Sequence, residues 1–245
     1  MILSWENTKV DGSLMKLYLG LPDGKGPFPA LVVIQHQGGV DEFVQEMVKK
    51  IAGAGYASVA PDLYHRDGPD CQDDGPTRRD RLHDLTVITD VNAAAAFLKG
   101  HNSVDAERLG IIGFCMGGRV SYLGAATNSN FKAAVAYYGG NIFIPWGEVP
   151  TPFDRTAEIH CPLIGHFGEE DKNPSPEDMR KLAAELTKHG KAHEFHSYPG
   201  AGHAFMNKWS NSYRAHAEEA SWPKTLDFLG RYLGKSAPNV AAASG

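Results

Sequence analysis

Short apolar runs rich in β-branched residues alternate with helical patterns along most of this chain. The clearest example is ALVVIQHQ, followed by DEFVQEMVKKIAGAG and YASVAPDLY, which predicts strand, helix and strand. Further segments continue the alternation, from RLGIIGF to the closing helical segment AEEASWPKTLDFLGRYLG. Strands separated by helices are typical of a parallel sheet, because a helix returns the chain to the edge where the first strand began. The sequence therefore predicts an α/β fold, with a mostly parallel central sheet flanked by helices.

The start of the chain follows a different pattern. The segments ILSWENTKV and LMKLYLGLP flank Asp11-Gly12, a dipeptide that favours the positive φ angles of a tight hairpin turn. We therefore expect an N-terminal β-hairpin. The polar stretch HRDGPDCQDDGPTRRDR interrupts the alternation, and we expect it to form a loop near the ligand-binding end. From the length of 245 residues we expect a single domain over residues 1–235 and a flexible C-terminal tail over 236–245.

Composition excludes several classes of partner. The net charge is −5 and no run of Lys or Arg could neutralise successive phosphates, so we expect no nucleic acid or membrane partner. The chain shows no secretory pattern at its start and no apolar segment long enough to cross a bilayer, which predicts a cytoplasmic protein. The cysteines Cys71, Cys115 and Cys161 are widely spaced and form no CxxC motif, so we expect neither a disulfide nor a metal site. The oligomeric state is left open.

The segment Gly113-Phe114-Cys115-Met116-Gly117 joins a predicted strand to a predicted helix. This is the pattern of a nucleophile elbow with Cys in place of Ser, in which glycines allow close approach of the backbone on either side of the nucleophile. The N-terminus of the helix would favour a thiolate over a thiol. A buried, inert cysteine is the alternative, and we accept it for Cys161.

A nucleophile of this kind needs a base and an acid, and in α/β-hydrolases both follow it in the order acid, then histidine. Asp171 follows a predicted strand in GHFGEEDKNPSP, with Glu169 and Glu170 as competitors for the same role. His203 lies in the Gly-rich segment YPGAGHAF after the last predicted strand. We therefore expect His203 to reach Cys115 while Asp171 orients the imidazole ring.

Taken together, these motifs make the chain resemble the dienelactone hydrolase family. The resemblance covers nearly the whole chain and is carried by PDLY, GFCMGG, YYG, CPLIGHFGEED and GAGHAF. It implies an α/β-hydrolase fold, a Cys-His-Asp triad on Cys115, His203 and Asp171, and hydrolysis of a small ester or lactone without a cofactor or metal. From their positions after predicted strands, we expect an oxyanion hole formed by the Met116 N–H and an N–H of the QHQGG loop, which we assign to Gln37. We also place Tyr64 of PDLY in the substrate site.

Two positions depart from the family pattern. Where family members carry Glu beside the resting thiol, this chain has His36, which we expect either to pair with Cys115 and favour its thiolate or only to line the pocket. Four residues after the histidine, where the family uses an arginine to hold a substrate carboxylate, it has Asn207. Arg81 could still bind that carboxylate, although Arg78 and Arg79 are equally well placed.

These departures leave more than one function open. The first is a dienelactone hydrolase-like enzyme that works through a thioester, with a general carboxylesterase of neutral substrates as its variant. A second is a non-catalytic relative that binds a small ligand, since fold does not dictate function. A third is a redox protein that uses Cys115, although no resolving cysteine lies near it in the sequence.

Overall fold

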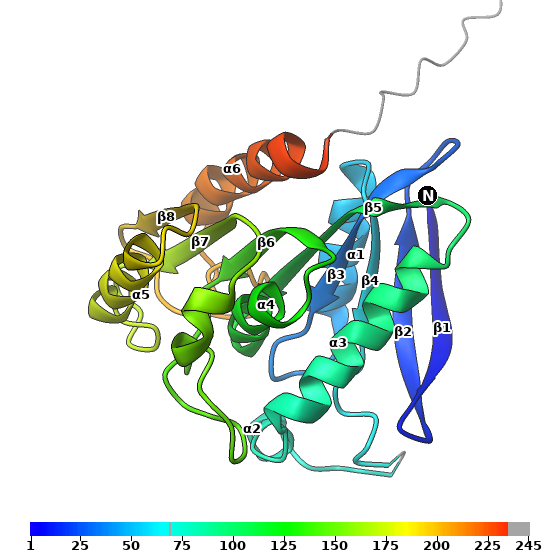
Figure 1. Ribbon diagram of the computed structural model, residues 1–245, viewed down its shortest axis with the longest axis horizontal. Coiled ribbons are helices and arrows are strands. Elements are labelled where there is room, and N and C mark those ends of the chain that lie inside the picture. The colour runs from blue at the N-terminus through cyan, green and yellow to red at the C-terminus, as the bar shows by residue number, and fades with distance from the viewer. Residues whose placement is uncertain (69, 235–245) are drawn as a thin grey trace, which may run out of the picture.

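The computed structural model describes residues 1–68 and 70–234, so the tail predicted at 236–245 lies outside the described residues. Its strands form an eight-stranded sheet in the order β1-β2-β4-β3-β5-β6-β7-β8 (Figure 1). The strands are β1 (Ile2–Val10), β2 (Ser13–Leu21), β3 (Phe28–Ile34), β4 (Ala57–Pro61), β5 (Val104–Phe114), β6 (Phe131–Tyr137), β7 (Leu163–Gly168) and β8 (His193–Tyr198). The strands from β3 to β8 run parallel, which confirms the predicted fold class.

The N-terminal hairpin is confirmed as well. Strands β1 and β2 pair antiparallel, with Val10 opposite Ser13. The turn residues Asp11 and Gly12 have φ angles of 50° and 81°, which are the positive values that this dipeptide favours. Strand β2 also pairs antiparallel with β4, so the hairpin extends the parallel sheet at one edge.

Helices cover both faces of the sheet. Apolar side chains of α1 and α6, such as Phe43 and Phe228, pack in one buried cluster. Side chains of α3, α4 and α5, such as Val91, Val120 and Leu182, pack in another. The helices are α1 (Glu42–Gly53), α2 (Gly75–Arg79), α3 (Asp84–Lys99), α4 (Met116–Thr127), α5 (Pro176–Lys188) and α6 (Ala215–Leu233). None of the described helices is both long and apolar enough to cross a membrane.

The strand order determines where a ligand can bind. From β3 the chain moves through α1 to β4 on one side, and then returns through α3 to β5 on the other side of β3. The loops that leave β3 and β5 therefore diverge over opposite faces of the sheet, which opens a crevice at their carboxyl ends. Ile34 and Gly113 are paired at that point, so the segments that follow them begin side by side.

Two short helices occur where the sequence predicted none. The segment 65–81, expected to be a loop, contains α2, which is capped where Asp74 accepts a hydrogen bond from the Thr77 N–H at 2.9 Å. Pro76 in its first turn adds a second start signal, so DGPT could have been recognised as a helix N-terminus. The 3-10 helix η1 (Phe153–Glu158) lies between β6 and β7.

Candidate active site

Cys115 occupies the sharp turn between β5 and α4. Its φ of 58° and ψ of −122° are unfavourable for a residue with a side chain, and such strain is concentrated at functional sites. The turn requires glycine on both sides: a Cβ atom on Gly113 would lie 2.0 Å from the Gly117 carbonyl oxygen, and one on Gly117 would lie 2.4 Å from that of Ile34. The thiol is thereby presented at the N-terminus of α4, at the crevice beside β3.

Asp171 and His203 meet at the same edge of the sheet. They follow β7 and β8, and Asp171 Oδ2 lies 2.8 Å from His203 Nδ1. The Asp171 side chain is only 3% exposed, which makes it a fixed acceptor for the ring. Of its two competitors, Glu170 is exposed and Glu169 instead accepts a hydrogen bond from Ser197. The structure therefore brings Asp171 to the histidine.

The electrostatic environment of His203 favours the imidazolium. Burial alone would lower the pKa of His203, but its hydrogen bond to Asp171 and its interactions with Cys115 outweigh that effect. The net result is a pKa raised above the ordinary value of 6.5. A ring that holds a proton between a thiol and a carboxylate is arranged to transfer that proton to and from sulfur.

Tyr64 brings Gln37 and Met116, the two residues predicted to form the oxyanion hole, close together. Met116 is the first residue of α4, so its N–H has no acceptor within the helix. Gln37 is held by Tyr64, whose hydroxyl donates to the Gln37 carbonyl oxygen at 3.0 Å and contacts Met116 Sδ at 3.6 Å. Within residues 1–68 and 70–234, neither N–H donates to another backbone group outside regular helices and strands. That both N–H groups form the oxyanion hole stays a prediction.

Of the two roles predicted for His36, the described residues show no hydrogen bond between its ring and Cys115. Its Nε2 lies 2.7 Å from Asp41 Oδ2, and its ring packs edge-on against Phe43. Asp41 is also the N-cap of α1, so its position is fixed by the helix that starts there. The imidazole therefore has a carboxylate partner within its own loop, and its role as a residue that lines the pocket stays a prediction.

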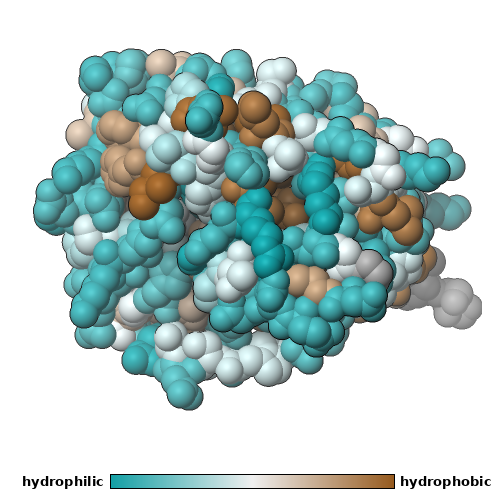
Figure 2. Space-filling model, turned by 90° about the horizontal axis from the view of Figure 1, so that it is seen from below, coloured by the Kyte–Doolittle hydropathy of each residue, from teal (hydrophilic) through white to brown (hydrophobic). Residues whose placement is uncertain are grey.

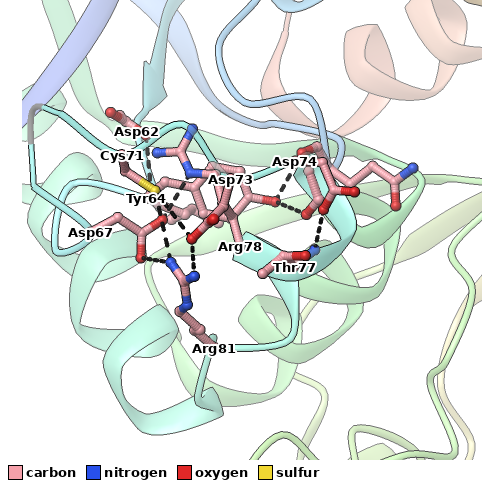
Figure 3. Close-up of polar contacts among 12 residues, drawn as sticks. Asp62, Tyr64, Asp67, Cys71, Asp73, Asp74, Thr77, Arg78 and Arg81 are labelled. Atoms are coloured by element: carbon pink, nitrogen blue, oxygen red, sulfur yellow. Dashed lines mark hydrogen bonds and ion pairs between the residues drawn. The ribbon is translucent and has the colours of Figure 1, made fainter.

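Arg81 is paired within its own segment. Its guanidinium group is bound by Asp67 and Asp73 of its own loop (Figure 3). The side chain is 45% exposed. Arg78 packs over the ring of Tyr64 at 4.3 Å and bonds Asp67, whereas Arg79 reaches Gln37 Oε1 at 3.4 Å. The segment therefore neutralises most of its own charge. Figure 2 shows this side of the molecule, where α2 lies, as mainly hydrophilic with small separate hydrophobic groups.

The remaining predicted positions have local partners. Asn207 uses its Oδ1 to accept a hydrogen bond from the Trp209 N–H at 2.9 Å, so it caps a turn and carries no charge. Cys161 is buried, and burial raises the pKa of its thiol to about 12. That environment keeps the Cys161 thiol protonated at neutral pH, in agreement with its interpretation as an inert core residue.

Tyr138 is a residue of this site that the sequence analysis did not select. It follows β6, adopts a φ of 38°, and is 1% exposed. Its ring packs against His203 with a centroid separation of 5.2 Å, and its hydroxyl has no hydrogen-bond partner among the described residues. The YYG motif contained the signal, because residues that follow a parallel strand lie at the edge that binds ligands.

Comparison with known proteins shows the family of this chain. Residues 15–233 match the model of the Dienelactone hydrolase family. The chain belongs to that family. A protein of Methylorubrum extorquens named "Putative carboxymethylenebutenolidase" is 34% identical over 221 residues, which cover 88% of this chain and 76% of that protein. A protein of Escherichia coli K12 with the same name is 33% identical over 233 residues, which cover 91% and 85%.

Solved structures give the same assignment. A "Putative Dienelactone Hydrolase" from Klebsiella pneumoniae superposes with a TM-score of 0.85 at 30% identity, covering 95% of this chain and all of that one. The predictions that the chain has an α/β-hydrolase fold and is a hydrolase of the dienelactone hydrolase family are confirmed.

Proposed function

We propose that Cys115, His203 and Asp171 hydrolyse a small carboxylic ester or lactone through a thioester intermediate. The observation that carries this proposal is the bond between Asp171 Oδ2 and His203 Nδ1 at 2.8 Å, on a ring whose pKa is also raised by Cys115. The names of the related proteins support a lactone or ester as substrate. A binding protein would have no need of a strained thiol beside an oriented imidazole.

In the first half of this reaction, His203 holds the proton of Cys115 and the thiolate attacks the carbonyl carbon of the substrate. A C–S bond forms, and the N–H groups of Met116 and Gln37 receive the negative charge that moves onto the carbonyl oxygen. The C–O bond to the alcohol then breaks, and His203 donates its proton to that oxygen. In a lactone, the alcohol remains attached to the acyl group.

The second half regenerates the enzyme. His203, now neutral, removes a proton from a water molecule, which attacks the thioester carbon. The C–S bond breaks, the carboxylic acid leaves, and the proton on His203 returns to the thiolate. Asp171 keeps Nδ1 of the ring occupied throughout, so that Nε2 is the atom that exchanges protons. Atoms and charges balance over the two half-reactions with only water as a second reactant.

Whether the substrate carries a negative charge is a separate question from the reaction. A second candidate function follows from the residues that could bind a substrate carboxylate. Arg81 is bound by two aspartates and position 207 is an uncharged Asn, so neither offers a cation to a substrate carboxylate. These contacts favour a general carboxylesterase that acts on neutral substrates. Arg79 remains the cation nearest to Gln37.

The proposal is tested by measuring hydrolysis of a dienelactone, a neutral lactone and p-nitrophenyl acetate side by side. Cys115→Ala should lose activity by several orders of magnitude, whereas Cys71→Ala should retain it because Cys71 bonds only within its own loop. Rapid-quench mass spectrometry with p-nitrophenyl acetate should find one acetyl group on Cys115.

Equal activity of wild type and Cys115→Ala on all three compounds, with no acetylated Cys115, would overturn the proposed mechanism. Preference for the dienelactone would show that the enzyme acts on an anionic substrate, although Asn207 stands where the family carries an arginine. Turnover of only the neutral compounds would assign the carboxylesterase.

A further inference from the structure

The carboxylate of Asp171 has partners on both oxygens, and only one of them belongs to the triad. Oδ2 bonds His203, whereas Oδ1 accepts a hydrogen bond from the backbone N–H of Asn173 at 2.9 Å. The direction in which the carboxylate points therefore depends on where the backbone of Asn173 lies. A fixed Asn173 would hold Oδ2 toward the imidazole.

Asn173 is itself fixed by a reciprocal pair of hydrogen bonds to Asn141. The Asn173 Oδ1 accepts from the Asn141 N–H at 2.9 Å, and the Asn173 Nδ2 donates to Asn141 Oδ1 at 2.7 Å. Two bonds between the same residues fix orientation as well as distance. The loop also leaves little space, because a Cβ atom on Gly140 would lie 2.8 Å from the Asn173 carbonyl oxygen.

Asn141 is in turn anchored to the helix that follows Cys115. Its carbonyl oxygen accepts a hydrogen bond from Arg119 Nε at 3.1 Å. Arg119 lies one turn after Cys115 on α4, its side chain is fully buried, and it forms a bidentate ion pair with Asp84 at 2.5 and 2.9 Å. Buried, paired guanidinium groups of this kind have little freedom to move.

These contacts form one continuous connection between the nucleophile and the acid. From Cys115 it runs along α4 to Arg119, through Asn141 to Asn173, and from there to Asp171. We propose that the Asn141–Asn173 pair is a positioning element. Because Arg119 holds Asn141 against α4, the pair fixes Asp171 relative to Cys115, and Asp171 in turn keeps His203 aligned with Cys115. This inference rests on the proposed function, since it concerns the alignment of the same triad.

The test uses three variants of the pair. Asn173→Ala removes both side-chain bonds but keeps the N–H that Asp171 accepts. Asn141→Gly removes only the Oδ1 acceptor, and it suits the φ of 58° at that position. Asn141→Asp keeps an oxygen at Oδ1 and should restore much of what Asn141→Gly loses. Misplacement of a catalytic group by about 1 Å costs up to about 100-fold. We expect Asn173→Ala to lower kcat by about 10- to 100-fold with little change in KM.

A second measurement separates positioning from a structural role. His203 faces Asp171, the Cys115 thiol and the ring of Tyr138, and NMR titration of its imidazole reports the strength of its bond to Asp171. In Asn173→Ala the pKa of His203 should fall toward its ordinary value. A structural role alone would lower the melting temperature without moving that pKa.

The control is Asn130→Ala, which removes another exposed amide with side-chain bonds, at the opposite end of β6. It should leave both kcat and the pKa of His203 unchanged. If Asn173→Ala keeps kcat within about twofold and the His203 pKa unchanged, the positioning element is refuted. If wild type shows no hydrolysis that depends on Cys115, the proposed function fails instead, and the NMR titration still decides whether the pair orients Asp171.

Discussion

Two adjacent buried tyrosines at the end of β6 differ in the hydrogen bonding of their hydroxyl groups, and this difference predicts opposite effects on stability when each hydroxyl is removed. The Tyr137 hydroxyl lies 2.7 Å from Thr225 Oγ1, whereas the Tyr138 hydroxyl has no hydrogen-bond partner among the described residues. The Met206 backbone lies near the Tyr138 hydroxyl but without the geometry of a hydrogen bond. Burial raises the pKa of both hydroxyls, so each is a neutral phenol at neutral pH.

The magnitude follows from what each hydroxyl loses on folding. A buried polar group without a partner costs about 1–3 kcal/mol, and a satisfied hydrogen bond contributes about 1 kcal/mol. Tyr138→Phe keeps the ring contacts with His203 and Phe205 and removes only the unpaired hydroxyl. We therefore expect Tyr138→Phe to raise the free energy of unfolding by about 1 kcal/mol, and Tyr137→Phe to lower it by about 1 kcal/mol.

Urea unfolding of the two variants and wild type at neutral pH measures this difference. The two changes remove the same atom from neighbouring positions, so effects on the unfolded chain largely cancel between them. The slopes of the transitions should agree, and only the midpoints should move in opposite directions. If Tyr138→Phe is destabilised as much as Tyr137→Phe, the Tyr138 hydroxyl has a partner in solution, and the reasoning from its unpaired state is refuted.

Three other perturbations have expected outcomes that follow from burial and charge. Asp84→Ala leaves the buried Arg119 without its counter-ion, so urea unfolding should show a loss of about 3–5 kcal/mol, and a loss below about 1 kcal/mol would contradict this. Cys161 should react with iodoacetamide only in denaturant, as peptide mapping would show, because it is buried and burial raises its pKa. His203 has a folded-state pKa above 6.5, so its contribution to stability is complete below pH 6.5 and is lost as pH rises through the raised value. In Asp171→Asn, the free energy of unfolding should fall less between neutral and alkaline pH than in wild type. An unchanged pH dependence would show that the Asp171 carboxylate does not raise the pKa of His203.

The elements that the sequence predicted well are those that depend on local chemistry. Asp11-Gly12 forms the hairpin turn because few other dipeptides adopt two positive φ angles. Strand β3 and the second half of β5, residues 109–114, are apolar and buried because helices cover both of their faces. Cys115 could be placed at a turn because glycine is required on both sides of it. In each case the residues that determine the structure are neighbours in the sequence.

Partners of long polar side chains were harder to predict, because they are chosen by loops that the sequence pattern does not describe. Arg81 was expected to bind substrate, yet the segment 65–81 contains five Asp and four Arg residues and pairs most of them internally. That near balance of charge was visible in the sequence and favours internal ion pairs over a free cation. The partner of His36 is likewise Asp41, a carboxylate within the same loop that neither of its two predicted roles included.

The residues that the sequence analysis missed have one thing in common. Tyr138 and Asn141 follow β6, and Asn173 follows β7, so all of them lie beyond the carboxyl ends of parallel strands. Their residue types are ordinary, and none of them is itself a candidate nucleophile, base or acid. Their importance arises from contacts between loops that only the strand order brings together, since β6 lies between β5 and β7. Once Cys115 and Asp171 are placed after β5 and β7, the residues after β6 must lie between them, and they are then the first candidates to hold the nucleophile and the acid in register.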